Sequence, residues 1–145
     1  MPDEDQKLKL AREFDAPVEK VWEAWKDPEI FAQWYGSPGT LEDVSIDFRV
    51  DGKWQATTVL ASGEKFPQTG IYTLIDEGHH IRFNFLDPDN PDNPDYEIMD
   101  VVFEPLGPRT QMSFIQTGNL PAEVYATGLK AGWTGFFDKL TEVIK

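Results

Sequence analysis

The two histidines of the sequence, His79 and His80, are the first candidates for metal binding or proton transfer. Adjacent residues on an extended chain point to opposite sides, so this pair is badly placed to ligate one metal ion. No third ligand follows at the spacing of a zinc site. We therefore predict an exposed turn at this position and no metal site.

A second candidate is the loop of residues 87–95, in which Asp and Asn alternate with three prolines. An EF-hand calcium loop needs a glycine at its sixth position and a bidentate glutamate at its twelfth. This loop lacks both residues, and its prolines fit the required geometry badly. The sequence favours a solvated connection between two strands.

Catalytic motifs are absent from the sequence. The chain has no cysteine and none of the patterns GxSxG, HExxH, GxxxxGK[ST] or GxGxxG. An acid or base could enter a pocket from the end of a strand, for example Asp47 or Glu97, but no spacing selects one. Arg82 and Asn84 alternate with apolar residues and are expected to face outward. We therefore assign no catalytic residue and no cofactor, and the sequence favours a binding protein over an enzyme.

Three glycines, Gly128, Gly132 and Gly135, lie in a segment with helical periodicity. Each costs about 1 kcal/mol relative to alanine inside a helix, so about 3 kcal/mol has to be offset by another effect. Two interpretations remain open. The bare backbone either leaves room for a ligand, or lets the helix approach aromatic side chains such as Trp22 or Trp25.

The chain contains ten Phe, five Trp and four Tyr, which is more than a small core commonly uses. Large rings on a concave sheet either interdigitate into a solid core or leave a cavity of ligand size. For any single ring a plain core position is the better prediction. The set as a whole is compatible with a partly open pocket near the first helices, and the predicted pocket residues are Trp34, Trp54, Tyr72, Phe85, Phe103, Phe114, Leu129, Gly132, Trp133 and Phe136.

Hydrophobic periodicity indicates the elements that position these residues. Alternation over residues 7–14 predicts a strand, and two helix-start signals predict short helices, the first ending at about Lys26 and the second near residues 36–39. From Leu41 to Thr117 the period is two, with regular turn signals, which predicts a meander of about six strands. Apolar residues three or four apart over residues 122–144 predict one helix about 34 Å long.

These elements predict an α+β fold, in which a curved antiparallel sheet of about six to seven strands wraps around the long C-terminal helix. Two short helices follow the first strand. A length of 145 residues suits one domain, so we predict a single domain over residues 1–145, with residues 1–6 as a flexible acidic tail.

The charge of the chain excludes some partners. The formal net charge is −13, from 26 acidic and 13 basic residues, which repels nucleic acid and anionic membranes. No apolar run approaches the ~18 residues of a membrane span. The N-terminus has no basic segment followed by an apolar core, so we expect no signal peptide and a cytoplasmic protein.

Several local strings occur in an order that is specific for one family. They are FDAPVEKVW at residues 14–22, DPEIFAQWYG at 27–36, VDGKW at 50–54, GIY at 70–72 and GWTGFFDKL at 132–140. Together they resemble the SRPBCC (START-like) superfamily, and within it the homologues of the activator of heat-shock protein 90 ATPase. The resemblance covers essentially the whole chain. It implies a helix-grip fold with a hydrophobic cavity between the long helix and the sheet.

The resemblance implies no single activity, because the superfamily includes lipid carriers, hormone receptors and aromatase/cyclases. The preferred hypothesis is a stress-related protein that binds a small hydrophobic or amphipathic ligand, such as a lipid, a polyketide or an aromatic metabolite. One alternative is a cyclase- or hydrolase-like enzyme that uses a buried carboxylate in the same cavity. Another is a co-chaperone-like interaction module with a chaperone as its partner. We expect a monomer or a weak dimer.

Overall fold

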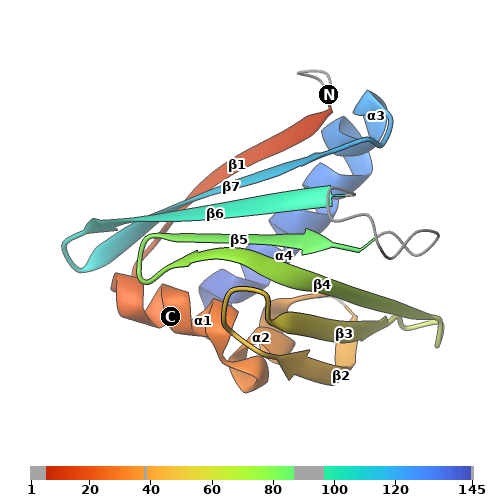
Figure 1. The fold of residues 1–145 in the computed structure, drawn as a ribbon, viewed down its shortest axis with the longest axis horizontal. Helices are drawn as coiled ribbons and strands as arrows, with labels where there is room; N and C mark the ends of the chain where they lie inside the picture. Colours follow the sequence, from red (N-terminus) through yellow and green to blue (C-terminus); the bar gives the residue numbers. More distant parts are fainter. Residues whose placement is uncertain (1–5, 38, 87–96, 145) are drawn as a thin grey trace.

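The computed structural model describes residues 6–37, 39–86 and 97–144 (Figure 1). In this part of the chain seven strands form one antiparallel sheet in the order β1-β7-β6-β5-β4-β3-β2. The predicted fold class and order of elements are confirmed. The strands are β1 (Lys7–Phe14), β2 (Thr40–Ile46), β3 (Lys53–Val59), β4 (Lys65–Asp76), β5 (His80–Phe85), β6 (Glu97–Leu106) and β7 (Arg109–Gly118).

Two short helices, α1 (Val18–Lys26) and α2 (Pro28–Trp34), follow β1 as predicted. Asp27 ends the first and caps the second, because its side chain accepts a hydrogen bond of 2.8 Å from the Glu29 amide. A proline directly after this cap occupies a position at which a helix needs no amide donor. The two helices therefore meet at a fixed corner and bury Trp22, Trp25 and Trp34.

The C-terminal helix is continuous but contains a π-helical turn between two α-helical segments. It consists of α3 (Ala122–Val124), the π-helical turn η1 (Tyr125–Leu129) and α4 (Lys130–Val143). Figure 1 shows it crossing one face of the sheet, with its C-terminal end beside α1. Its buried face carries Trp133, Phe137 and Leu140. No helix in the described ranges combines the length and the apolar character that a membrane span requires.

The described strands contain two irregularities in their pairing. The register shifts between Glu42 and Ser45 in β2 and between Tyr72 and Leu74 in β4. A bulge of this kind bends its strand and increases the local twist, which favours the curvature that lets a sheet enclose a helix.

Asn84 in β5 corrects one prediction. Arg82 is exposed as expected, but Asn84 is only 2% exposed. The described pairing of β4 with β5 ends at Tyr72 and Phe83, close to the bulge. The Asn84 Oδ1 atom accepts a hydrogen bond of 2.8 Å from the Ile71 amide just beyond that point. The side chain is buried because its Oδ1 atom takes the place of a backbone carbonyl as hydrogen-bond acceptor between β4 and β5. The alternation of polar and apolar residues in the sequence does not reveal this role.

Candidate ligand site between the long helix and the sheet

The aromatic side chains between the C-terminal helix and the sheet form a nearly continuous layer. Trp133 of α4 lies 4.3 Å from Phe114 of β7 and 5.2 Å from Phe136, measured between ring centroids. Trp54 of β3 lies 5.5 Å from Phe85 of β5. Such tilted and edge-on pairs pack rings efficiently and stabilise a core beyond the area they bury.

The ten predicted pocket residues do not all line one common site. Phe103 contacts Trp22 of α1 at 5.3 Å, whereas Trp34 packs on Trp25 at 4.8 Å. Most of the ten are fully buried, while Phe85, Leu129, Gly132 and Phe136 are half-buried. The half-buried residues lie toward solvent, and the others belong to the packed layer.

One enclosed cavity remains within this layer. Its volume is about 10 Å³, and its lining residues are Trp25, Phe31, Trp54, Tyr72, Ile81 and Phe83. That volume is at the lower limit of what holds one water molecule. The sequence predicted Trp54 and Tyr72 as pocket residues but missed the other four lining residues, Trp25, Phe31, Ile81 and Phe83.

Polar atoms in the layer are mostly paired. The indole nitrogen of Trp54 donates to the Asn84 carbonyl at 3.2 Å, and that of Trp34 donates to the Ala24 carbonyl at 3.0 Å. Trp25 differs, because its Nε1 is buried and has no acceptor among the described residues. A buried donor of this kind is rare in native proteins and calls for an explanation.

Two tyrosine hydroxyls lie in or beside the layer. Tyr35 donates a hydrogen bond of 2.8 Å to Gln68 Oε1, and burial raises the pKa of its phenol far above the ordinary value of 10.0. Burial also raises the pKa of Tyr72, which has no hydrogen-bond partner for its hydroxyl among the described residues. Both side chains therefore stay neutral under all physiological conditions.

The glycine stripe of the C-terminal helix faces open space. A Cβ atom built on Gly128 or Gly132 would meet no described atom within 4 Å, and one on Gly135 would lie 4.0 Å from the Ser37 carbonyl. The interpretation that these glycines let the helix approach Trp22 or Trp25 is therefore wrong. Gly128 is exposed, so this space opens to solvent; we call the surface formed by Gly128, Gly132, Leu129 and Phe136 the glycine groove.

Glu97 at the start of β6 is the buried carboxylate of the site, with 2% of its surface exposed. Its Oε1 accepts hydrogen bonds from Gln116 Nε2 at 2.9 Å and from the Tyr125 hydroxyl at 2.8 Å. Its Oε2 accepts from the Asn119 amide at 3.1 Å. Protein donors thus satisfy the carboxylate, which is not among the residues lining the enclosed cavity.

This carboxylate joins three elements. Gln116 of β7 accepts a hydrogen bond of 2.8 Å from the indole of Trp133 in α4, and Tyr125 lies in η1. Gly118 leaves the space that the carboxylate occupies, since a Cβ atom there would overlap it. The sequence had named Glu97 as an acid entering from a strand end. The other acid it named, Asp47, is exposed and pairs with Arg49 at 2.9 Å.

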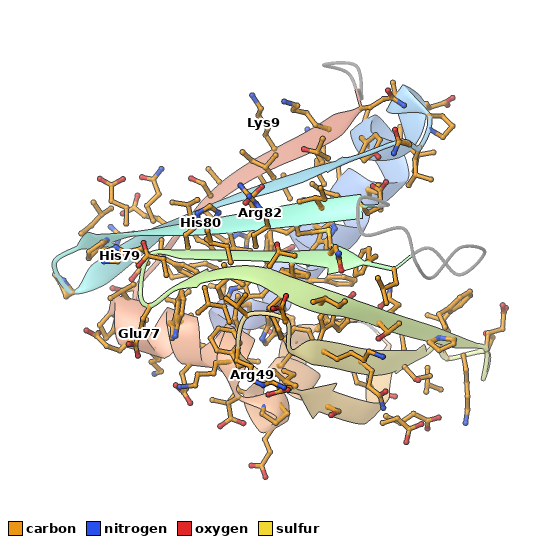
Figure 2. All side chains as sticks on the ribbon, in the orientation of Figure 1. Lys9, Arg49, Glu77, His79, His80 and Arg82 are labelled. Atoms are coloured by element: carbon orange, nitrogen blue, oxygen red, sulfur yellow. The ribbon has the colours of Figure 1, made fainter. Side chains whose placement is uncertain are left out.

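The outer face of the sheet carries the histidines. His79 is exposed at a turn as predicted, whereas His80 Nε2 lies 2.7 Å from Asp100 Oδ1, which also accepts from Arg82 Nε at 2.7 Å. Figure 2 shows Lys9 on β1 and both His80 and Arg82 on β5. Within the described ranges no group of three or more acidic, His or Cys side chains could hold a metal ion. The loop 87–95 lies outside the described residues.

Comparison with known proteins identifies relatives. A sequence model of the family described as "Activator of Hsp90 ATPase homolog 1-like protein" matches residues 15–145. Protein NE0264 from Nitrosomonas europaea has a similar structure, with a TM-score of 0.85, 22% identity, and coverage of 98% of this chain and 96% of that one. The AHSA1-like protein from Aeromonas hydrophila gives a TM-score of 0.73, 23% identity, and coverage of 94% and 92%. No curated protein matches the sequence.

Proposed function

The chain belongs to the family of Activator of Hsp90 ATPase homolog 1-like proteins, and from this premise we propose that it binds a small apolar or amphipathic molecule between its C-terminal helix and its sheet. Proteins with this fold typically bind hydrophobic ligands. A lipid, a polyketide or an aromatic metabolite would match the apolar and aromatic side chains that border the glycine groove.

The observation that carries this proposal is the open space in front of the glycine stripe. Gly128 and Gly132 weaken the helix by about 1 kcal/mol each, and no neighbouring side chain uses the room they leave. Leu129 and Phe136 border that room and are only half-buried. A ligand that covers this apolar surface would offset the cost of the glycines.

Tyr35 contacts side chains of both the glycine groove and the enclosed cavity. Its ring centroid lies 5.1 Å from that of Phe136, 5.8 Å from that of Trp133 and 6.2 Å from that of Trp54. Ligand sites usually have volumes of about 300–1,000 Å³, far above the roughly 10 Å³ of the cavity. We therefore expect the ligand to bind along the groove, with Tyr35 moving to admit part of it.

Titration of the isotope-labelled protein with a library of fatty acids, polyketides and aromatic compounds tests the proposal. We expect chemical-shift changes concentrated at Leu129, Gly132 and Phe136, with smaller changes at Tyr35. A library that produces no response at these residues would count against ligand binding in the groove.

The enzyme and co-chaperone alternatives gain no comparable support. Acid/base chemistry requires a carboxylate in the cavity, and none of the six side chains lining it is acidic. A chaperone interaction through a strongly acidic outer face would need that face to be uniformly acidic. The described part of it includes Lys9 and Arg82, and Asp100 already pairs with Arg82 and His80.

A further inference from the structure

Trp25 is the one side chain in the described ranges whose buried polar atom has no hydrogen-bond partner. The residue is 3% exposed and lines the enclosed cavity. Its indole nitrogen can only donate a hydrogen bond, so the missing partner has to be an acceptor. The indoles of Trp34, Trp54 and Trp133 each find such an acceptor within the protein.

Tyr72 lines the same cavity, and its hydroxyl has no hydrogen-bond partner among the described residues. Burial keeps this hydroxyl protonated, so it too can donate. The remaining lining residues are Phe31, Trp54, Ile81 and Phe83, and the Trp54 indole is already paired with Asn84. The cavity therefore combines one buried uncommitted donor, the Trp25 indole, with apolar walls and with the side chain of Tyr72, whose hydroxyl is not fully enclosed.

The absence of charged side chains among the described lining residues limits which ligand groups the cavity can bind. No basic side chain lines it, so an anionic group would be buried without a counter-charge, at a high desolvation cost. A cationic group would find no carboxylate there and would meet the indole donor of Trp25. An uncharged acceptor oxygen avoids both costs and satisfies the Trp25 donor.

We infer that the enclosed cavity is the polar subsite of the ligand site, and that it takes an uncharged acceptor oxygen, such as the carbonyl oxygen of a ketone, lactone or quinone. This inference rests on the proposed function and specifies the ligand class. A cavity of about 10 Å³ suits one oxygen-sized group, while the apolar body of the ligand lies in the glycine groove beyond Tyr35.

A matched pair of small probes tests the inference. Acetophenone and α-methylstyrene have the same shape and differ in a carbonyl oxygen against a methylene group. The Trp25 indole N–H signal is assigned by its loss in Trp25→Phe and is followed during titration of the wild-type protein. We expect acetophenone to move this signal downfield and to bind about fivefold more tightly than α-methylstyrene, as one net hydrogen bond implies. Benzoate, which is anionic, should bind more weakly than either.

Variants separate hydrogen bonding from packing. Trp25→Phe and Tyr72→Phe should each reduce the preference for acetophenone over α-methylstyrene. Trp22→Phe is the matched control, because Trp22 lies on the same helix and does not line the cavity. It should retain the full preference. If Trp25→Phe does not fold, the preference of the milder Tyr72→Phe variant for acetophenone over α-methylstyrene is the test.

Each contrary outcome has a distinct meaning. Equal binding of the two probes with an unmoved Trp25 signal would overturn the subsite while leaving a ligand site in place. A Trp25 N–H that exchanges magnetisation with a bound water, and still does so in saturating acetophenone, would likewise overturn it. Binding of neither probe, together with no response to the wider library, would remove both the subsite and the proposed function.

Discussion

At the scale of single residues, the buried polar groups distinguish structural from ligand-binding roles. Glu97 accepts hydrogen bonds from Gln116, Tyr125 and the Asn119 amide, so protein donors satisfy both of its carboxylate oxygens. The buried indole donor of Trp25, in contrast, has no acceptor in the described ranges. The Glu97 network links elements of the fold, whereas the proposed subsite gives the Trp25 donor a role in ligand binding.

Two Tyr→Phe substitutions test this distinction. Removing the Tyr125 hydroxyl takes a donor from a buried carboxylate, so Tyr125→Phe should lower the free energy of unfolding by about 1.5–3 kcal/mol. Tyr72→Phe removes a hydroxyl without a partner and should cost less than about 1 kcal/mol. Urea denaturation measures both. Equal losses would contradict the assigned roles.

The tyrosine pKa values predict how stability depends on pH. In the folded protein the pKa values of Tyr35 and Tyr72 are raised above 10.0 by burial, while in the unfolded chain they are ordinary. Above pH 10 the unfolded state therefore binds fewer protons, and the free energy of unfolding falls as pH rises. This contribution is fully present below pH 10.

Ultraviolet absorbance of tyrosinate checks this expectation. Tyr35 and Tyr72 should ionise only together with alkaline unfolding, and Tyr72→Phe should reduce the loss of stability above pH 10. Ionisation of both phenols near pH 10 in the folded protein would show that they are not buried as described.

At the scale of elements, the helices and strands were predictable because their signals are local. Alternation marks β1, and the proline after Asp27 marks the start of α2. The bulge in β4 and the π-helical turn η1 were not predicted. Both depend on contacts between distant residues, such as the Asn84 side chain with the Ile71 amide and Tyr125 with Glu97. The candidate site was predicted only in part for the same reason. The spacing of aromatic residues along the sequence does not reveal which of their side chains contact one another in the fold.

Two Gly→Ala substitutions test the packing of these elements. Gly132→Ala places a methyl group in open space inside α4, so it should raise the free energy of unfolding by about 1 kcal/mol. Gly118→Ala places the same group where the Glu97 carboxylate lies and should be destabilising by about 2 kcal/mol or more. Thermal unfolding of both variants measures the contrast. A stabilising Gly118→Ala would contradict the close approach.

At the scale of the whole molecule, the helix-grip architecture brings the aromatic layer, the glycine groove and the Glu97 network together around one helix (Figure 1). The net charge is −13, although Lys9 and Arg82 are basic residues on the outer face of the sheet (Figure 2). The proposed ligand site lies on the inner face, where none of the described residues lining the small cavity is charged. A monomer or weak dimer remains a prediction.

The affinity of Gly132→Leu for the tightest ligand found in the library tests the central claim most directly. A Cβ atom at this position meets no described atom within 4 Å, and leucine favours the helix more than glycine does, so the protein should stay folded. Ala131→Leu adds similar bulk at the neighbouring exposed position and serves as the control. We predict that calorimetric titration shows at least about tenfold weaker binding for Gly132→Leu and unchanged binding for Ala131→Leu. Wild-type affinity in Gly132→Leu would contradict the account.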